Sequence, residues 1–268
     1  VKSLMNTWTA QMGYPVLNVE SKRDDKGVKL EVSQSRFLFS HLVDGEAGAG
    51  SWKVPISVIT SWGEAPAPTL MDAASGTIDI KAPTDSAKTW FKVNTDQTGF
   101  YRVNLSLDDW NALIPAIASR ALSDTDRLGV QNDAYALSRA GYLPVSQFLA
   151  IAEAYKDEID ASVWRELAGN LGDLDTLLSD EACYPQLKAL CQSLFTPLAK
   201  RMGWEPKSGE GHLDTLLRGV ALGQAGYYDD PVVLGEAKSR FEKYLKDPSS
   251  LAPDLRGVVY SLTAQQGD

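Results

Sequence analysis

The hydrophobic pattern of this 268-residue chain changes its period near residue 105, and this change constrains the fold more than any motif does. Before it, short runs alternate apolar and polar residues with the period of two that half-buried strands show. After it, apolar residues recur every three or four positions, as on one face of a helix. The last two strand patterns, at 90–94 and 100–103, flank turn residues and predict a β-hairpin. The sequence therefore predicts a β region followed by an α region.

The strand patterns are short, and turn residues separate them. They cover 16–21, 28–33, 36–39, 52–60, 69–71, 77–80, 88–94 and 100–103. Asp-Asp-Lys-Gly at 24–27 provides a hairpin turn between the first two. Short strands with frequent turns are typical of an antiparallel β-sandwich, which is the fold we predict for the β region.

The helical patterns have the length and spacing of packed helix pairs. They cover 108–119, 127–139, 146–155, 161–178, 185–202, 212–225, 231–245 and 255–264, with a shorter one at 1–13. Pro115 predicts a kink or a break in the first of the long helices, and Ser123 with Asp126 predicts a capped start for the second. Helices of this kind joined by short loops predict a HEAT/ARM-like helical-repeat domain, although no strict sequence repeat is visible.

Composition excludes several classes of function. The net charge of −9 argues against an extended nucleic-acid surface, which requires clustered Lys and Arg. No apolar run approaches the ~18 residues of a membrane helix, so we expect no membrane partner. Cys183 and Cys191 would lie about 12 Å apart along one helix, too far to form a disulfide. Two unpaired thiols suit a reducing compartment.

The residues needed for hydrolytic chemistry are mostly missing. The chain has two histidines, His41 and His212, and no H-E-x-x-H motif, G-x-S-x-G elbow or Walker loop. Each histidine is predicted to be a surface or capping residue, and no cofactor site is predicted in this chain. The helical region is rich in carboxylates, which are predicted to lie on solvated helix faces. These include Asp124, Asp126, Asp133, Asp173 and Asp175.

One stretch has the pattern of a possible binding site. Residues 209–214 read Gly-Glu-Gly-His-Leu-Asp and precede an apolar helix that carries Arg218. A helix N-terminus favours a carboxylate, so His212 and Arg218 are our candidates for lining a peptide cavity. The alternative is an ordinary helix cap with a surface arginine.

Several segments, in order, resemble the puromycin-sensitive branch of the zinc aminopeptidases of the gluzincin class. Residues 5–15 (M-N-T-W-T-A-Q-M-G-Y-P) resemble the end of that family's catalytic domain, and 52–56 and 92–102 resemble strands of its β-sandwich. Residues 126–133 (D-R-L-G-V-Q-N-D) and 138–141 are similar to the start of its helical domain. Residues 203–214 with 217–219 look closest to the cytosolic type, and 255–256, 259–260 and 266–268 continue the resemblance. The resemblance spans essentially the whole chain.

The resemblance implies a piece of an enzyme. In that family the H-E-x-x-H helix, the further zinc ligand and the exopeptidase motif lie in a preceding catalytic domain, so zinc belongs to the parent protein. Residues 1–15 would be the tail of that domain, 16–104 the sandwich, and 105–268 an incomplete helical domain. The expected partners are the catalytic domain of the same polypeptide and peptide substrates, and the expected location is the cytoplasm. The chain alone is expected to be inactive.

Two other functions are compatible with the residues. One is a free-standing protein-interaction module that uses a concave helical-repeat surface. The other is an independent hydrolase with an unrecognised carboxylate site.

Overall fold

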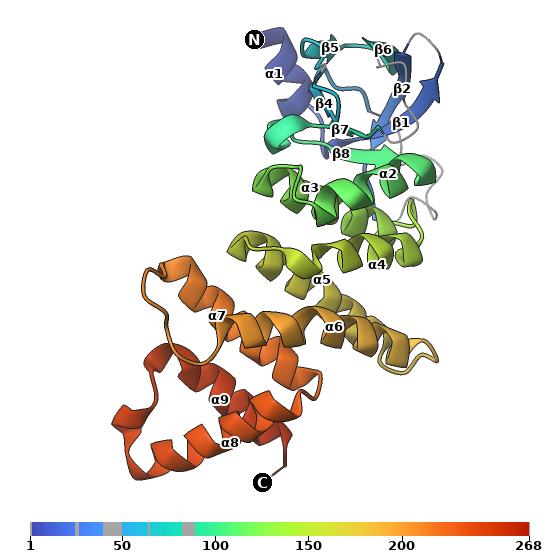
Figure 1. The fold of residues 1–268 in the computed structure, drawn as a ribbon. Helices are drawn as coiled ribbons and strands as arrows, with labels where there is room; N and C mark the ends of the chain where they lie inside the picture. The colour runs from blue at the N-terminus through green and yellow to red at the C-terminus, as the bar shows by residue number, and fades with distance from the viewer. Residues whose placement is uncertain (1, 25–26, 40–49, 64, 82–88, 268) are drawn as a thin grey trace. The chain divides into compact units, whose positions relative to one another are not determined.

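The structure is a computed structural model that describes residues 2–24, 27–39, 50–63, 65–81 and 89–267. The chain divides into two compact units, residues 1–154 and 155–268. Strands give way to helices between Leu105 and Leu107, inside the first unit, which confirms the predicted order of a β region and then an α region. Figure 1 follows this order along the chain. The domain boundaries at 15/16 and 104/105 stay predictions.

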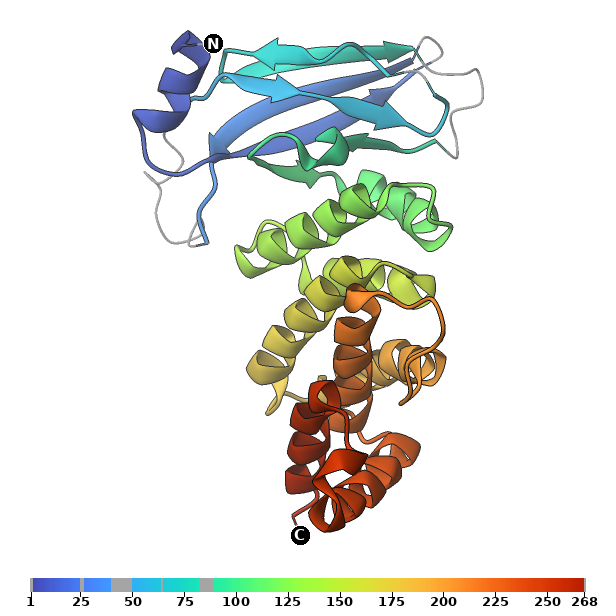
Figure 2. The same cartoon turned by 90° about the vertical axis from the view of Figure 1, so that its left-hand side faces the viewer.

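The first unit contains the strands. They are β1 (Pro15–Arg23), β2 (Gly27–Arg36), β3 (Val54–Ile56), β4 (Val58–Thr60), β5 (Thr69–Met71), β6 (Ser75–Lys81), β7 (Phe91–Val93) and β8 (Arg102–Leu105). A four-stranded sheet has the order β6-β2-β1-β8, and the pairs β3-β5 and β4-β7 form two short ladders. Apolar side chains from the sheet and from both ladders are buried and form the core of this region. Figure 2 shows the strands gathered at one end of the unit, with α2 (Leu107–Ala118) beneath them.

The sheet is mixed, so the predicted all-antiparallel arrangement is wrong in one place. β1 and β2 pair antiparallel as the hairpin predicted from residues 24–27, and Asp24 N donates to Gly27 O at 3.0 Å. β8, however, pairs with β1 in parallel, with Val16 opposite Arg102. Parallel neighbours need a long connection, and the many residues between β1 and β8 provide one. Sequence patterns give strand positions but not the direction in which distant strands pair.

The predicted hairpin at 90–104 is also wrong, although both strands exist. β7 pairs with β4 in one ladder, whereas β8 pairs with β1 in the four-stranded sheet. The segment between them contains a short 3₁₀ helix (Thr95–Gln97) and three non-glycine residues with positive φ: Asn94, Asp96 and Gln97. This longer turn sends the chain into a different sheet instead of reversing it along the same one.

The first unit also contains four helices in its described residues, and the one predicted at 1–13 ends earlier, at Thr9. They are α1 (Lys2–Thr9), α2, α3 (Asp124–Arg139) and α4 (Val145–Glu153). Ser123 Oγ accepts a hydrogen bond from Asp126 N at 3.1 Å, which confirms the predicted start of α3. Gly141, with φ of 79°, follows the end of α3, as predicted for a C-terminal glycine. α2 is one helix across Pro115, so the alternative of a break at this residue is wrong.

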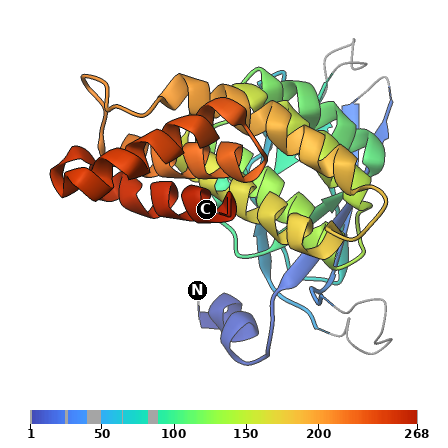
Figure 3. The same ribbon diagram turned by 90° about the horizontal axis from the view of Figure 1, so that it is seen from below.

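The elements of the second unit are helices, and its described residues contain no strand. It contains α5 (Ala161–Leu178), α6 (Tyr184–Met202), α7 (His212–Tyr227), α8 (Pro231–Lys246) and α9 (Pro253–Gln265). Two short 3₁₀ helices, Ala154–Asp157 and Pro248–Ser250, precede α5 and α9. The predicted ranges agree with these helices to within two residues at each end. Figure 3 shows α8 and α9 side by side, and the Phe241 and Tyr260 rings make an edge contact between them at 5.9 Å.

The two cysteines are free, as predicted. Cys183 is exposed just before α6, and Cys191 is buried within it. Burial raises the pKa of the Cys191 thiol to about 11, so this group stays protonated and packs as an apolar residue. Within the described part of the chain, no helix has both the length and the apolar character needed to cross a lipid bilayer.

Candidate functional site

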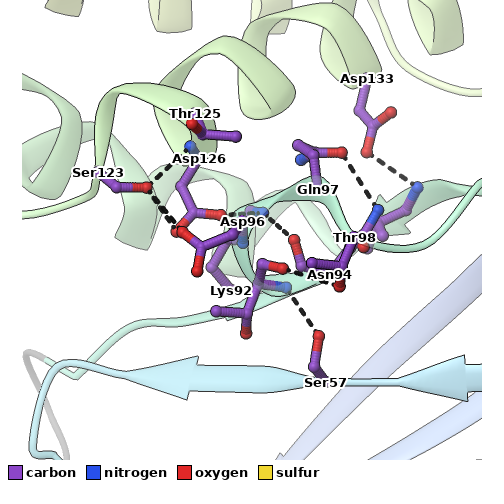
Figure 4. A network of polar contacts seen from close by, with 12 residues as sticks. Ser57, Lys92, Asn94, Asp96, Gln97, Thr98, Ser123, Thr125, Asp126 and Asp133 are labelled. Atoms are coloured by element: carbon purple, nitrogen blue, oxygen red, sulfur yellow. Dashed lines mark hydrogen bonds and ion pairs between the residues drawn. The ribbon is translucent and has the colours of Figure 1, made fainter.

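The turn between β7 and β8 is fixed by side chains of its own sequence. The Asn94 amide donates to Gly99 O at 2.9 Å, and Asn94 Oδ1 accepts from Gly99 N at 2.8 Å. Ser57 accepts from two backbone amides of the turn, through its O from Asn94 N and through its Oγ from Thr95 N, each at 2.9 Å. A Cβ at Gly99 would lie 2.1 Å from the Tyr101 ring, so this position requires glycine. The turn is therefore a rigid feature, and Figure 4 shows its contacts.

A buried ion pair joins this turn to the start of α3. Lys92 is 3% exposed, and its ammonium lies 2.5 Å from Asp126 Oδ1, which is equally buried. The same ammonium also donates to the carbonyl of Asn94. Asp126 Oδ1 accepts from Asp96 N at 2.8 Å, and Asp126 Oδ2 accepts from the Ser123 hydroxyl at 3.1 Å. Burial lowers the pKa of Lys92, and Asp126 opposes that shift.

A second pair lies about two helical turns further along α3. Arg102 Nη1 donates to Asp133 Oδ1 at 3.1 Å and to Asn132, and Val103 N donates to Asp133 Oδ2 at 3.1 Å. Burial raises the pKa of Asp133 to about 6, against the opposing effects of Arg102 and of the Val103 amide. β7, the turn and β8 are thus each bound to α3 by a polar contact.

The prediction that these carboxylates lie on solvated faces is wrong for three of them. Asp126, Asp133 and Asp175 are buried, whereas Asp124 and Asp173 are exposed as predicted. Asp175 accepts from the hydroxyls of Tyr184 at 3.0 Å and Tyr227 at 2.7 Å within the second unit. A carboxylate is buried when partners from other segments satisfy it, and helical periodicity does not identify those partners.

The alternation of residues 90–94 predicted a half-buried strand. The structure buries all three residues of β7. One signal was present in the sequence: Lys92 is a charged residue between apolar neighbours in a strand that leads into the polar turn at 94–99. A lysine in that position requires a carboxylate partner, but its identity depends on tertiary structure.

Gly129 is required for the contact between α3 and the turn. A Cβ at this position would lie 1.6 Å from Gln97 Nε2 and 2.1 Å from Gln97 Cδ. We expect Gly129→Ala to destabilise the first unit by about 1–3 kcal/mol, because Gln97 must leave its place and release Asn94. The measurement is the free energy of unfolding in urea.

Two variants serve as controls for this prediction. Gly169 lies in α5 with no atom within 4 Å of an added Cβ, so Gly169→Ala is expected to stabilise its helix by about 0.5–1 kcal/mol. The double variant Gln97→Ala/Gly129→Ala should recover most of the loss. A Gly129→Ala protein as stable as the original would show that Gln97 can move away from the added methyl group at little cost in free energy.

Asp133 gives the first unit a defined pH dependence. Its pKa in the folded state, about 6, exceeds the unfolded value of 3.8, so the folded state binds this proton more tightly. This contribution is fully present below the unfolded pKa and is lost as the pH rises through 6. Through this group alone, the unit should be about 1 kcal/mol more stable at pH 5 than at pH 7.

Comparison with Asp133→Asn isolates this effect, because all other titrating groups are common to both proteins. When the pH is lowered from 7 to 5, the unfolding free energy of the original chain should rise by about 1 kcal/mol more than that of the variant. The opposite sign would mean that Arg102 dominates and holds the Asp133 pKa low.

A surface hollow of about 260 Å³ lies beside the Arg102–Asp133 pair. Its walls include Tyr14, Gln97, Phe100, Arg102 and Asn132. Gln97 Nε2 is buried and has no hydrogen-bond partner among the residues that the structure describes. Phe100 at the rim is 72% exposed. The hollow therefore has an exposed aromatic ring at its rim, whereas the unsatisfied Gln97 donor is buried against Gly129 of α3. No motif in the sequence analysis indicated this hollow.

The two residues predicted to line a peptide cavity lie in the second unit and differ in exposure. His212 is the first residue of α7 and is exposed. Arg218 is 1% exposed, and its guanidinium donates to Gly203 O at 3.1 Å and to Glu210. Arg218 and the Lys207 amide lower the pKa of Glu210. The alternative interpretation, a surface arginine, is therefore wrong for Arg218. Its buried guanidinium binds two residues of the 203–211 loop.

The helix cap of that alternative is present nevertheless. Gly211 N donates to Asp214 Oδ2 at 2.8 Å, which is the half of a capping box that a glycine can make. Arg240, which lies 4.9 Å over the Trp204 ring and donates to Glu205 at 2.7 Å, anchors the loop a second time. Contact of His212 and Arg218 with a peptide stays a prediction.

The described residues do not fit a zinc site. They contain no group of three His, Cys, Asp or Glu side chains that could hold a metal ion. The second histidine, His41, lies outside the described residues. No step of metal chemistry is therefore assigned to the residues described in this chain.

Comparison with known proteins shows the family. Residues 90–268 match the model of the ERAP1-like C-terminal domain. The chain is 35% identical to Aminopeptidase M1-A of Oryza sativa subsp. japonica over 97% of its length, and 32% identical to Aminopeptidase M1 of Arabidopsis thaliana over 100%. It is also 31% identical to Glutamyl aminopeptidase of Bitis rhinoceros. These alignments cover 30%, 31% and 27% of the relatives, respectively. The chain therefore belongs to the ERAP1-like C-terminal domain family of the M1 aminopeptidases.

Proposed function

We propose that this chain is a non-catalytic C-terminal region of a cytoplasmic, zinc-dependent aminopeptidase that removes N-terminal residues from peptides. The observation that carries the proposal is similarity over the whole chain to proteins named aminopeptidases, of which it spans about 30%. The full sequence has two histidines and no H-E-x-x-H motif, so zinc and the catalytic groups would belong to the rest of the parent protein.

Within that protein, the strands would form a β-sandwich that acts as a spacer. The helices would form a HEAT/ARM-like bowl that faces the catalytic domain and encloses a peptide cavity. Such a bowl can exclude water and limit substrate length, while the zinc site performs hydrolysis. The tight Lys92–Asp126 and Arg102–Asp133 contacts support this role, because a spacer must hold its adjoining helices at a fixed angle.

The test compares this chain with the full-length polypeptide. We expect the full-length protein to hold one zinc ion and to hydrolyse aminoacyl amides, and the chain alone to do neither. Stoichiometric zinc in the chain alone, together with hydrolysis that a single acidic substitution abolishes, would favour an independent hydrolase instead. A native protein of the mass of this chain, 29.2 kDa, in source cells would favour an interaction module.

His212 offers a test of the cavity. Because its side chain is exposed, His212→Ala should leave folding unchanged. In the full-length enzyme we expect it to raise KM for long peptides about fivefold, the effect of one lost polar contact, and to leave aminoacyl amides unaffected. Lys246→Ala, at an exposed position on α8, is the control. Equal KM values for His212→Ala and the original enzyme would remove His212 from the cavity.

A further inference from the structure

We infer that the free edge of β6 binds an extended segment of another protein, in which an apolar residue lies between two basic residues. The segment would pair with β6 and extend the four-stranded sheet by one strand. This inference goes beyond the proposed function, because it depends on neither zinc nor peptide hydrolysis.

The first argument is the main chain of β6, which lies at one side of the sheet in the order β6-β2-β1-β8. Gln34 N donates to Ala74 O at 2.9 Å where β2 and β6 meet. Hydrogen-bonded and non-hydrogen-bonded pairs alternate along an antiparallel ladder, so residues 76, 78 and 80 bond to β2 in this register. The amides and carbonyls of residues 75, 77 and 79 therefore point away from β2.

These main-chain groups are open within the described part of the chain. β6 pairs with β2 alone, and no hydrogen bond from another described segment reaches the main chain of residues 75, 77 and 79. Trp62 Nε1 donates to Lys81 O at 2.7 Å and closes the edge beyond them. Edge strands are often protected by proline or a bulge, but residues 75–78 read Ser-Gly-Thr-Ile and pair with β2 without a break. This edge is therefore available to a further strand.

The second argument is a pair of hollows, one on each face of the sheet at the same part of β6. The inner hollow, about 150 Å³, lies between β6 and β5, and its apolar lining includes Ile56, Leu70, Met71 and Ile78. Figure 1 labels these two strands next to each other. The outer hollow, about 400 Å³, has residues 33, 75 and 77 in its lining. Side chains of an added strand alternate between the faces, so one would enter the inner hollow and its neighbours would lie over the outer one.

Gly76 keeps the inner hollow open. A Cβ at this position would lie 3.8 Å from Met71 Cγ, an ordinary contact, so a larger side chain here would occupy the space. Leu70, another residue of the lining, is 49% exposed. A space of about 150 Å³ holds a group of the size of benzene, and the inner hollow therefore suits a leucine side chain.

The third argument is the charge of the outer hollow, whose lining includes Glu20 and Glu31. These two residues lie directly opposite each other in the β1–β2 ladder, where like charges destabilise a sheet. Lys22 pairs with Glu31 at 2.5 Å, whereas Glu20 has no ion-pair partner among the described residues. One further cation is therefore favoured here. Thr77 is opposite Glu31, so Glu31 is two strand spacings, about 10 Å, from an added strand, a distance that a lysine and a glutamate side chain span together.

A second copy of this chain is a poorer partner for the edge. β6 contains Asp79 two residues after Thr77, so an antiparallel pair of β6 strands centred on Ile78 would set Asp79 of the copy opposite Thr77. That arrangement adds a third carboxylate to the row of Glu20 and Glu31. A separate basic segment relieves the charge of this row instead.

The first experiment measures amide hydrogen exchange of the 268-residue chain by NMR during titration with a synthetic peptide. The peptide has 7 residues, the length of β6, with leucine at its centre between two lysines and with serine and threonine outside them. We expect the amides of Thr77 and Asp79 to exchange at least about tenfold more slowly with bound peptide, because each gains an acceptor on the added strand. The Ile78 amide, which already bonds to β2, should stay unchanged.

Two further peptides test the chemistry of recognition. Replacing both lysines by glutamates should raise the dissociation constant Kd at least about tenfold, because the outer hollow then faces like charge. Methylating the main-chain nitrogens of the peptide at alternate residues keeps the lysines and the leucine but prevents pairing, so protection of Thr77 should disappear.

The second experiment compares variants of the chain with the original peptide. Thr77→Pro removes an amide that faces the edge and leaves the β2 ladder intact, so Kd should rise at least about tenfold. Thr77→Val, which keeps the amide, is the matched control and should change Kd less than about twofold. Gly76→Val fills the inner hollow and should also raise Kd about tenfold, without loss of stability, because valine favours strands.

The charge of the outer hollow is tested in the same way. Glu31→Lys should raise Kd about tenfold at low salt and less at high salt. Glu153→Lys, at an exposed position on α4, changes the net charge equally and should change Kd less than about twofold.

The inference is wrong if the peptide leaves exchange of Thr77 and Asp79 unchanged, or if the methylated peptide binds equally well, which would indicate attraction by charge alone. Slow exchange of Thr77 in the dilute chain without peptide would overturn it too, since another segment of the chain would then cover the edge. Protection without peptide that is lost on dilution would assign the edge to a second copy instead.

Discussion

Replacing Lys92 by methionine is expected to destabilise the first unit by about 3–5 kcal/mol, the usual loss when one partner of a buried ion pair is removed. Methionine fills much of the same space as lysine, so the loss of stability measures the effect of removing the ammonium charge. Asp126 would stay buried with hydrogen bonds from Asp96 N and Ser123 but without a counter-charge. The Asn94 carbonyl would also lose the lysine donor and keep only the bond from Gln97 N at 3.1 Å. The measurement is the urea-dependent unfolding free energy of the chain, with hydrogen exchange of α3 to assign the loss to the first unit.

The exposed pair of Lys29 and Asp79 provides the control. Their side chains are 50% and 76% exposed at 3.7 Å separation, so Lys29→Met should change stability by less than about 1 kcal/mol. A double variant, Lys92→Met/Asp126→Asn, should be less unstable than the sum of the single changes, because it removes the uncompensated charge. A Lys92→Met protein as stable as Lys29→Met would show that Asp126 is satisfied without Lys92.

Replacing Arg218 by methionine is expected to destabilise the second unit by about 2–4 kcal/mol. The guanidinium is buried, and its loss would leave Gly203 O without this donor and Glu210 without its counter-charge. The expected loss is smaller than for Lys92, because Glu210 can turn toward solvent. Amides 203–211 should exchange faster than in the original chain, since Arg218 holds this loop, and α9 should exchange faster only through global unfolding.

Arg165 is the matched control, because it lies exposed on α5 in the same unit. Arg165→Met should change stability by less than about 0.5 kcal/mol. If Arg218→Met left exchange of the loop unchanged, Arg240 and its contacts with Trp204 and Glu205 would be sufficient to hold the loop.

Local sequence was sufficient wherever neighbouring residues supply the partners. The Ser123 cap of α3, the glycine after it and the range of α5 were all predictable, because each depends on residues within one or two helical turns. The β1–β2 hairpin was predictable for the same reason.

The candidate sites were less predictable, because their partners are distant in the sequence. Lys92 and Asp126 are 34 residues apart, and the parallel pairing of β8 with β1 joins residues 86 apart. The same pattern of carboxylates on a helix is compatible with solvent exposure or with burial. For Arg218, the sequence indicated a residue of interest, and the structure showed that its guanidinium faces the 203–211 loop.

The sequence by itself determined the order of β and α regions, the ranges of most helices, the free thiols and the family. These follow from hydrophobic period, local capping and the order of motifs, all of which are properties of adjacent residues. Only the tertiary structure decided the mixed sheet, the separation of β7 from β8, the buried ion pairs and the Phe100 hollow. Each of these features depends on which distant segments pack together and exclude water from one another's polar groups. The free energy of burying a polar group therefore depends on the whole packed unit.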